Sequence, residues 1–289
     1  MATETPGVAT APAPGRNGGP ILETSEVAKH FGGIFAVDGA SLSVRERSIT
    51  ALIGPNGAGK TTFFNVITGF YRADGGAANF QGSPILGRPP HAIARLGMVR
   101  TFQITKALAR MPVIDNMLLA APDQPGERML GLLTRPAASR KRETEIRRDA
   151  MELLEVFNLE PLAEQYAGTL SGGQRKLLEL ARALMTRPRM LLLDEPMAGI
   201  NPTLGRRLLD HMQRLRAEEG VTFLFIEHDM EVVMNHSDRV IVMAEGRVIA
   251  EGAPEEVRAD RRVIDAYLGS GTVSERPAGQ PPPGGGHGA

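Results

Sequence analysis

A glycine-rich segment near the start of the chain combines the residue types that hold a polyphosphate. Gly54, Gly57 and Gly59 let the backbone turn tightly and direct several N–H groups into one concavity that suits phosphate oxygens. Lys60 and Thr61 complete the G-x-x-x-x-G-K-[ST] order, in which the ammonium reaches the β- and γ-phosphates and the hydroxyl binds Mg²⁺. The segment therefore predicts a site for a nucleoside triphosphate and magnesium.

Acidic residues follow a predicted strand farther along the chain. Residues 190–193 form an apolar run that ends in Asp194 and Glu195. Because ligands of open parallel α/β sheets lie at the carboxyl ends of the strands, these carboxylates should lie beside the phosphate loop. We expect Asp194 to bind the metal and Glu195 to polarise the attacking water. Two acids that cap the next helix are the alternative, which the complete phosphate loop disfavours.

Two more polar side chains follow predicted strands. His228 follows the predicted strand 221–226 after one intervening acid, Glu227, and there it could bind a γ-phosphate oxygen or the attacking water. Gln103 follows the predicted strand 98–102, although a lone glutamine is usually only a polar loop residue. We expect the other histidines to be solvated or hydrogen-bonded at the surface, namely His30, His91, His211, His236 and His287.

A second glycine-rich segment, residues 170–174, opens a predicted helix over residues 175–186. Its backbone N–H groups would lie at the positive end of a helix macrodipole, where anions bind. No phosphate of its own is apparent for this segment. The chain therefore carries two predicted anion sites, of which only one has the lysine and carboxylates that nucleotide chemistry needs.

The elements that must position these residues are predicted as two lobes. Residues 21 to about 102 mix short alternating segments with the phosphate loop, a strand over 50–53 before it and a helix over 62–70 after it. Residues 104–185 are mostly helical in pattern, and strands resume at residue 190. A hairpin is expected from residues 239–243 and 247–251. One helix should bury the face formed by Ile146, Ala150, Leu153, Leu154 and Phe157.

The composition limits the classes of function that remain. The 289 residues, 42% of them apolar, suffice for one large core, and 33 acidic residues balance 33 basic ones, so overall charge gives no reason to bind nucleic acid. The absence of cysteine excludes disulfides and thiolate metal sites. No apolar run approaches the roughly 18 residues of a membrane span, so any transport must use another polypeptide. Residues 1–20 and 269–289 are predicted to be disordered tails.

Together, and in this order, these residues resemble the nucleotide-binding subunit of an ABC transporter. The resemblance covers residues 21–268 and implies an α/β fold: a P-loop NTPase core with a mixed sheet, an antiparallel β region and a helical subdomain at about 104–186. The Walker A loop is matched by Gly54, Asn56, Gly57, Ala58, Gly59, Lys60, Thr61 and Thr62, the Q-loop by Gln103, and the signature by Ser171, Gly172, Gly173 and Gln174. Asp194 matches the Walker B aspartate, Glu195 the catalytic glutamate, His228 the switch histidine and Phe31 the adenine-stacking aromatic residue, and the implied magnesium ligands are Thr61, Gln103 and Asp194.

The resemblance also implies partners. In this family two subunits enclose two ATP molecules, each held between the Walker A loop of one chain and the signature of the other, which would explain the second anion site. The implied activity is ATP hydrolysis coupled to transport at the cytoplasmic face of the inner membrane. The implied partners are permease subunits, a second ATP-binding subunit, identical or related, and indirectly a periplasmic solute-binding protein.

The sequence indicates the transported solute less specifically than it indicates the ATPase mechanism. Residues 194–202, 99–103, 226–230 and the ending Ala266-Tyr267-Leu268-Gly269 look most like subunits that energise uptake of branched-chain amino acids, and importers of urea or short amides share much of this pattern. One departure is Asn201, where many members have an aspartate. The amide keeps the shape and the acceptor oxygen of an aspartate but loses its charge. We therefore expect Asn201 to alter communication between the two ATP sites of the pair.

Other interpretations remain at this stage. A soluble ATP-driven switch on DNA or ribosomes would usually carry a long coiled-coil insertion or two ATPase domains, and neither is visible. A scaffold that binds nucleotide without hydrolysis is disfavoured by the presence of both Glu195 and His228. Residues 111–117 resemble the family's contact surface for the membrane subunit, and ordinary core is nearly as good an interpretation of that apolar stretch.

Overall fold

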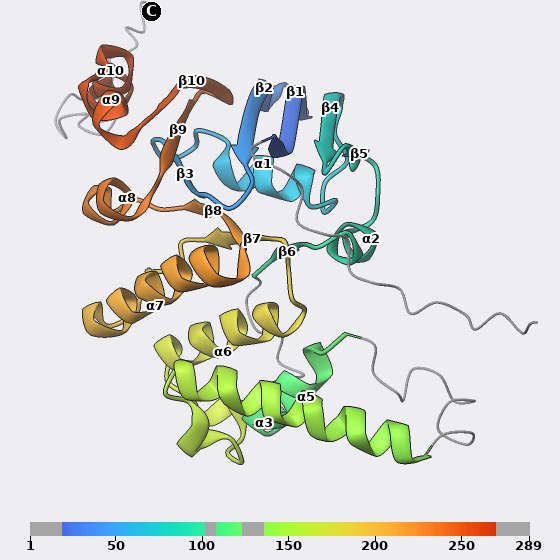
Figure 1. Ribbon diagram of the computed structural model, residues 1–289. Coiled ribbons are helices and arrows are strands. Elements are labelled where there is room, and N and C mark those ends of the chain that lie inside the picture. Colours follow the sequence, from blue (N-terminus) through green and yellow to red (C-terminus); the bar gives the residue numbers. More distant parts are fainter. Residues whose placement is uncertain (1–18, 102–107, 123–135, 270–289) are drawn as a thin grey trace, which may run out of the picture.

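The chain folds into two β-sheets and a group of helices, which the computed structural model describes for residues 19–101, 108–122 and 136–269 (Figure 1). The predicted hairpin over residues 239–251 is present. Most of each predicted tail, and Gln103, lie outside the described residues. Within the described ranges, no helix is both long enough and apolar enough to cross a membrane.

The larger sheet has six strands in the order β10-β9-β3-β8-β7-β6, and all neighbours are parallel except the hairpin of β9 and β10. Its strands are β3 (Ile49–Ile53), β6 (Met98–Arg100), β7 (Met190–Asp194), β8 (Thr222–Ile226), β9 (Arg239–Ala244) and β10 (Arg247–Gly252). Every residue of β3 and β8 is buried, as expected for parallel strands covered on both faces.

The smaller sheet is antiparallel, with the strand order β2-β1-β4-β5. Its strands are β1 (Pro20–Phe31), β2 (Ile34–Arg45), β4 (Gly75–Phe80) and β5 (Ser83–Pro84). This sheet and the larger one enclose helix α1 (Lys60–Ile67), whose Phe63, Phe64 and Ile67 are fully buried. The helix that follows the phosphate loop is thereby fixed between two sheets.

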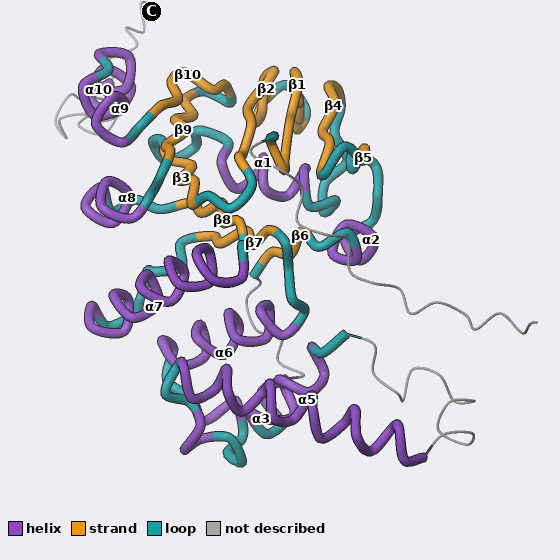
Figure 2. Tube along the Cα trace, viewed as in Figure 1, coloured by secondary structure: helices purple, strands orange, loops and turns teal. Residues whose placement is uncertain are grey.

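The remaining helices fall into two groups, which Figure 2 separates from the strands by colour. A group without strands lies below the larger sheet and contains α3 (Val113–Ala120), α5 (Pro136–Val156) and α6 (Gly172–Met185) (Figures 1 and 2). The others are α2 (Pro90–Arg95), α7 (Pro202–Arg214), which continues into a π-helical turn (Leu215–Glu219), α8 (Met230–His236), α9 (Pro254–Ala259) and α10 (Arg261–Gly269).

Alternate residues of the central strands divide the core into two clusters. Leu191 and Leu193 of β7 pack with the helices α3, α5, α6 and α7 on one face of the larger sheet. Met190 and Leu192 pack with α1 and the smaller sheet on the other face. Because the side-chain period of a strand is two, the continuous apolar run of β7 supplies both cores at once. The strand ends that carry polar residues are therefore held between two packed layers.

The described helices confirm the predicted apolar face. Ile146, Ala150, Leu154 and Phe157 are buried, and Leu153 is partly buried at its edge. The stretch 111–117 belongs to this core as well, because Val113, Ile114 and Met117 are at most 1% exposed. The core interpretation is therefore correct for these three side chains, which are too deeply buried to form the expected contact surface for the membrane subunit.

One histidine prediction is wrong. His211 is only partly exposed, and its ring lies edge-on to Phe157 with 5.1 Å between centroids. Its Nε2 is buried and has no hydrogen-bond partner among the residues that the structure describes. Burial lowers the pKa of His211, so the neutral imidazole is favoured. Its position on α7, facing α5, was not apparent from the local sequence.

Candidate functional site

The phosphate loop connects β3 to α1, and two of its glycines are required by the fold. Gly54 has a φ of 146°, and a Cβ there would lie 2.0 Å from the carbonyl oxygen of Met243 on β9. Gly59 has a φ of 94°, and a Cβ there would lie 2.1 Å from the carbonyl oxygen of Ala36 on β2. Both sheets therefore press on the back of the loop, and only glycine fits these two positions.

Lys60 is 6% exposed and its ammonium is bound to the loop itself. The Nζ atom donates to the carbonyl oxygens of Gly54 at 2.7 Å and Pro55 at 3.0 Å. Burial lowers the pKa of Lys60, and the negative charges of Glu195 and Asp194 oppose this shift. The ammonium therefore lies in a partly dehydrated place within the field of both carboxylates, where an anionic phosphate would be attracted to it.

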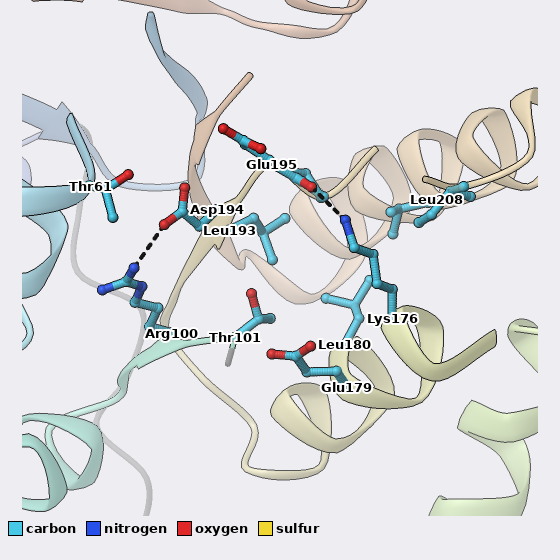
Figure 3. A pocket seen from close by; sticks show the side chains of 12 residues that line it. Thr61, Arg100, Thr101, Lys176, Glu179, Leu180, Leu193, Asp194, Glu195 and Leu208 are labelled. Carbon is cyan, nitrogen blue, oxygen red and sulfur yellow. Dashed lines mark hydrogen bonds and ion pairs between the residues drawn. The ribbon is translucent and has the colours of Figure 1, made fainter. Parts of the chain in front are cut away.

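Asp194, the last residue of β7, forms an ion pair that the sequence analysis missed. Arg100, at the end of the neighbouring strand β6, approaches it with 2.8 Å between Nη2 and Oδ2 (Figure 3). A second guanidinium nitrogen of Arg100, Nη1, donates to Oδ1 of Asn65 on α1 at 2.6 Å. The Arg100 side chain is 9% exposed. A charged residue at the end of a buried strand pattern was the available signal, and only the pairing of β6 with β7 reveals its partner.

Glu195 and His228 lie side by side at the same edge of the sheet. His228 Nε2 is 2.7 Å from Glu195 Oε1, and both side chains are 45% exposed. Glu195 has a φ of 49°, an uncommon backbone conformation for a residue with a Cβ, and such positions concentrate at functional sites. The structure thus brings together the two residues that sequence analysis assigned to the attacking water and the γ-phosphate.

A third acid, Glu227, fixes the two loops that carry this pair. It is 5% exposed, and its carboxylate accepts the N–H groups of Met197 at 2.8 Å and His228 at 3.2 Å. Burial raises the pKa of Glu227, and these two N–H donors oppose the shift. Sequence analysis gave it no role, although an acid directly after an apolar strand was visible.

These groups line two neighbouring clefts. A cleft of 280 Å³ is formed by the phosphate loop together with Glu195, His228, Ile34 and Phe35. A cleft of 480 Å³ separates Asp194 and the end of β6 from α6 (Figure 3). Helix α6 contributes Lys176, whose Nζ donates to the backbone carbonyl oxygens of Glu195, at 3.1 Å, and of Ala198.

Glu179 lies one turn farther along α6 and lines the same cleft. Its burial raises its pKa to about 7, although the nearby cations Arg182, Lys176 and Arg100 partly oppose this shift. This carboxyl group therefore changes its charge near neutral pH.

The predicted signature segment lies at the start of α6 and does not line the phosphate-loop cleft. Ser171 Oγ accepts the N–H of Gln174 at 3.3 Å, and Gln174 Oε1 accepts the N–H of Ser171 at 2.8 Å, which is a complete capping box. Neither Gly172 nor Gly173 has a positive φ, and a Cβ at Gly172 would meet no atom within 4 Å. The fold of the single chain does not explain these glycines.

The other predicted residues are placed as follows. Phe31 is 47% exposed, with its ring edge-on to Tyr71 at 5.4 Å and the Lys29 ammonium 5.2 Å from its centroid. Asn201 caps α7, because its Oδ1 accepts the N–H of Thr203 at 2.9 Å. Gln103 falls outside the described residues.

The donor set fits magnesium. Thr61 and Asp194 offer a hydroxyl and a carboxylate that both line one cleft (Figure 3). In the part of the chain that the structure describes, no three His, Cys, Asp or Glu residues gather to hold a metal by themselves. Magnesium in such sites is held by one or two protein oxygens together with substrate phosphates, so these two ligands suffice.

Comparisons with known proteins agree with this geometry. The model of the ABC transporter family matches residues 37–198, and that of branched-chain amino acid ATP-binding cassette transporters matches residues 247–272. The chain is 46% identical over 250 residues to the high-affinity branched-chain amino acid transport ATP-binding protein BraF of Pseudomonas aeruginosa, covering 86% of this chain and 98% of that one. It is 44% identical over 250 residues to a probable LivG protein of the same transport class from Archaeoglobus fulgidus, covering 86% and 96%.

Solved structures give the same result. A nucleotide-free ATP-binding cassette from an ABC transporter superposes with a TM-score of 0.73 at 41% identity, covering 86% of this chain and 98% of that chain. The ADP conformation of an ATP-binding cassette gives a TM-score of 0.73 at 41% identity, covering 86% and 99%.

Proposed function

The chain belongs to the ABC transporter family as an ATP-binding subunit, and from this premise we propose that it hydrolyses ATP to drive uptake of branched-chain amino acids through a membrane permease. The observation that carries the catalytic part is the convergence of Lys60, Glu195 and His228 on the cleft of the phosphate loop, with Asp194 beside it. Nucleotide binding alone needs no acid and histidine in mutual contact at the mouth of that cleft.

The proposed chemistry assigns one task to each group. Glu195 orients and polarises the attacking water, and His228 binds the γ-phosphate or that water. Lys60 leaves its backbone acceptors to meet the phosphate oxygens, while Phe31 stacks on the adenine. Magnesium, held by Thr61, Asp194 and Gln103, would neutralise charge on the phosphates.

We further propose that the signature segment acts on the nucleotide of a second subunit. Ser171, Gly172 and Gly173 lie away from the phosphate-loop cleft of their own chain, and the glycines meet no steric demand there. A missing Cβ beside a helix N-terminus leaves room for a phosphate to reach the N–H groups and the dipole. A partner chain that supplies its own nucleotide would use that room.

The solute class rests on the relatives. BraF and LivG are named for branched-chain amino acid transport, and residues 247–272 match the C-terminal model of that group. Urea and short amides are not favoured by these names. We propose as partners a permease and, indirectly, a periplasmic solute-binding protein, and as location the cytoplasmic face of the membrane.

The test uses the subunit reconstituted in vesicles with its co-purified permease and solute-binding protein. Wild-type protein should hydrolyse ATP faster when leucine, isoleucine or valine is supplied. Glu195→Gln should reduce turnover about 10²- to 10⁴-fold and leave ATP binding nearly unchanged. Glu143→Gln, an exposed position on α5, is the matched control. Turnover by Glu195→Gln at the wild-type rate would exclude the catalytic assignment, and stimulation by urea alone would exclude the solute class.

A further inference from the structure

Lys176 of α6 lines the second cleft, and the proposed chemistry gives it no task. Its Nζ donates to the backbone carbonyl oxygen of Glu195 at 3.1 Å (Figure 3), and also to that of Ala198. Both acceptors lie in the loop that joins β7 to α7. An ammonium from the helical group therefore binds the backbone of the residue that we assign to the attacking water.

Helix α6 holds Lys176 in a fixed place. The next two residues, Leu177 and Leu178, are at most 2% exposed and belong to the core cluster on this face of the larger sheet. The capping box of Ser171 and Gln174 fixes the start of the same helix. The ammonium is therefore presented from a helix that is anchored in the core and closed at its N-terminus.

The backbone of Glu195 is bound on both sides of its Cα. Its N–H donates to the carbonyl oxygen of Ile226, the last residue of β8, at 3.0 Å. Its own carbonyl oxygen accepts the Lys176 ammonium and the N–H of Ala198, the latter at 3.2 Å. The φ of 49° is a conformation that persists only where the surroundings fix it.

These backbone contacts direct the carboxylate of Glu195. The side chain is 45% exposed, so packing against neighbours does little to orient it. With the N–H and the C=O fixed, the direction of the Cα–Cβ bond is fixed as well. Lys176 supplies the contact on the carbonyl side that comes from outside the loop.

The loop has another support that does not involve Lys176. The buried carboxylate of Glu227 accepts the N–H of Met197 at 2.8 Å. A carboxylate thus binds a donor of the loop, and an ammonium binds two of its acceptors. Because the Glu227 contact remains when Lys176 is replaced, we expect the variant to fold.

We propose that Lys176 is a positioning residue for ATP hydrolysis, which fixes the backbone of Glu195 so that its carboxylate faces the attacking water. The inference rests on the proposed function, in which Glu195 orients that water. A displacement of about 1 Å at a reacting group can cost roughly 10²-fold in rate. In the described structure, Lys176 is not among the residues that line the phosphate-loop cleft. Its loss should therefore lower kcat without weakening nucleotide binding.

A purely structural role for Lys176 makes a different prediction. In that case the ammonium only braces α6 against the core, and its loss lowers the melting temperature but not kcat at temperatures well below melting. Lys176→Met keeps the stem of the side chain and removes the ammonium, whereas Lys176→Arg keeps a charged donor. Lys141→Met is the matched control, because Lys141 is an exposed lysine on α5.

The experiment measures steady-state ATP turnover, MgADP affinity by titration calorimetry and melting temperature for the full-length wild type and these variants. For Lys176→Met we expect a kcat about 3- to 30-fold lower, the effect of a hydrogen bond to a charged group that water partly replaces. The Kd for MgADP should stay within about twofold of wild type. Lys176→Arg should recover part of the lost rate, and Lys141→Met should change neither quantity.

A second comparison tests whether Lys176 acts through Glu195. In the Glu195→Gln background, single-turnover measurements should show that Lys176→Met lowers the residual rate by less than about twofold, because the group that Lys176 positions has already lost its function. A residue that acts independently of Glu195 would lower the rate by the same factor in both backgrounds.

A kcat for Lys176→Met within twofold of wild type would overturn the inference, whatever the melting temperature. Equal losses in the two backgrounds would do the same, and so would a loss of MgADP affinity as large as the loss of kcat. Failure of the proposed function has a different signature, because the wild type itself would then bind MgADP without turning over ATP. Failure of the inference alone leaves wild type and Lys176→Met equally active.

Discussion

The ion pair between Arg100 and Asp194 gives a quantitative test of how the metal site is built. In the structure this guanidinium supplies the positive charge nearest to Asp194, at 2.8 Å, and its carbon atom lies 5.6 Å from the centroid of the Phe64 ring. Arg100→Met keeps much of the packing of the arginine stem and removes the charge. The substitution therefore leaves Asp194 with less compensation in a partly buried place.

The magnitude follows from the exposure of the two side chains. Breaking a fully buried pair costs about 3–5 kcal/mol, because the remaining charge stays buried. Here the Arg100 side chain is 9% exposed but that of Asp194 is 22% exposed, so water compensates part of the loss. We expect Arg100→Met to lower the free energy of unfolding by about 1–3 kcal/mol in the absence of nucleotide. With saturating MgADP, the penalty should fall to less than about half, because the magnesium ion beside Asp194 then supplies the missing charge.

The assay is urea unfolding of wild type and variant with and without MgADP. Arg148→Met is the matched control, because Arg148 pairs with Asp149 at 3.1 Å but is 67% exposed, and it should cost less than about 0.5 kcal/mol. An Arg100→Met penalty no larger than that of the control would refute the reasoning from burial. An equal penalty with and without MgADP would refute the assignment of Asp194 to the metal.

Three further predictions follow from other parts of the site. Burial raises the pKa of Glu179 to about 7, so the folded protein holds this proton more tightly than the unfolded chain does. The resulting contribution to stability is fully present below pH 4.5 and is lost as the pH rises through 7. The melting temperature of Glu179→Gln should therefore gain on wild type between pH 5 and pH 8, and a constant difference would contradict this. Gly59→Ala should lower stability by more than about 2 kcal/mol and abolish nucleotide binding in calorimetry, since its Cβ would lie 2.1 Å from a backbone oxygen; wild-type binding would contradict the described loop. Ser171→Ala should cost about 0.5–2 kcal/mol through loss of the helix cap, measured by urea unfolding, and no loss would mean that the capping box contributes nothing.

The sequence alone was enough to locate the parts of the site whose chemistry is local. The loop that begins at Gly54 and ends at Thr62 is a contiguous motif, and the runs before Asp194 and His228 are apolar enough to predict buried strands. Because parallel strands present their carboxyl ends at one edge, their order in the chain was sufficient to bring these residues together. The role proposed for Ser171 and its neighbours requires a second chain, so the fold of one chain does not test it.

The remainder depends on neighbours that are distant in the sequence. Arg100 meets Asp194 only because β6 pairs with β7, and Lys176 reaches the loop after Glu195 only because α6 packs below it. An apolar stretch such as residues 111–117 fits a buried helix and a docking surface equally well, since periodicity describes a face and not what covers it.

The central claim is that each ATP is held between the phosphate loop of one chain and the signature segment of another. It is tested most directly by the molar mass of Glu195→Gln in sedimentation equilibrium, with and without saturating MgATP. We predict a monomer without nucleotide and a dimer with MgATP, and dissociation when Ser171 is also replaced by arginine. A strictly monomeric Glu195→Gln at saturating MgATP, also in the presence of its permease, would contradict the account.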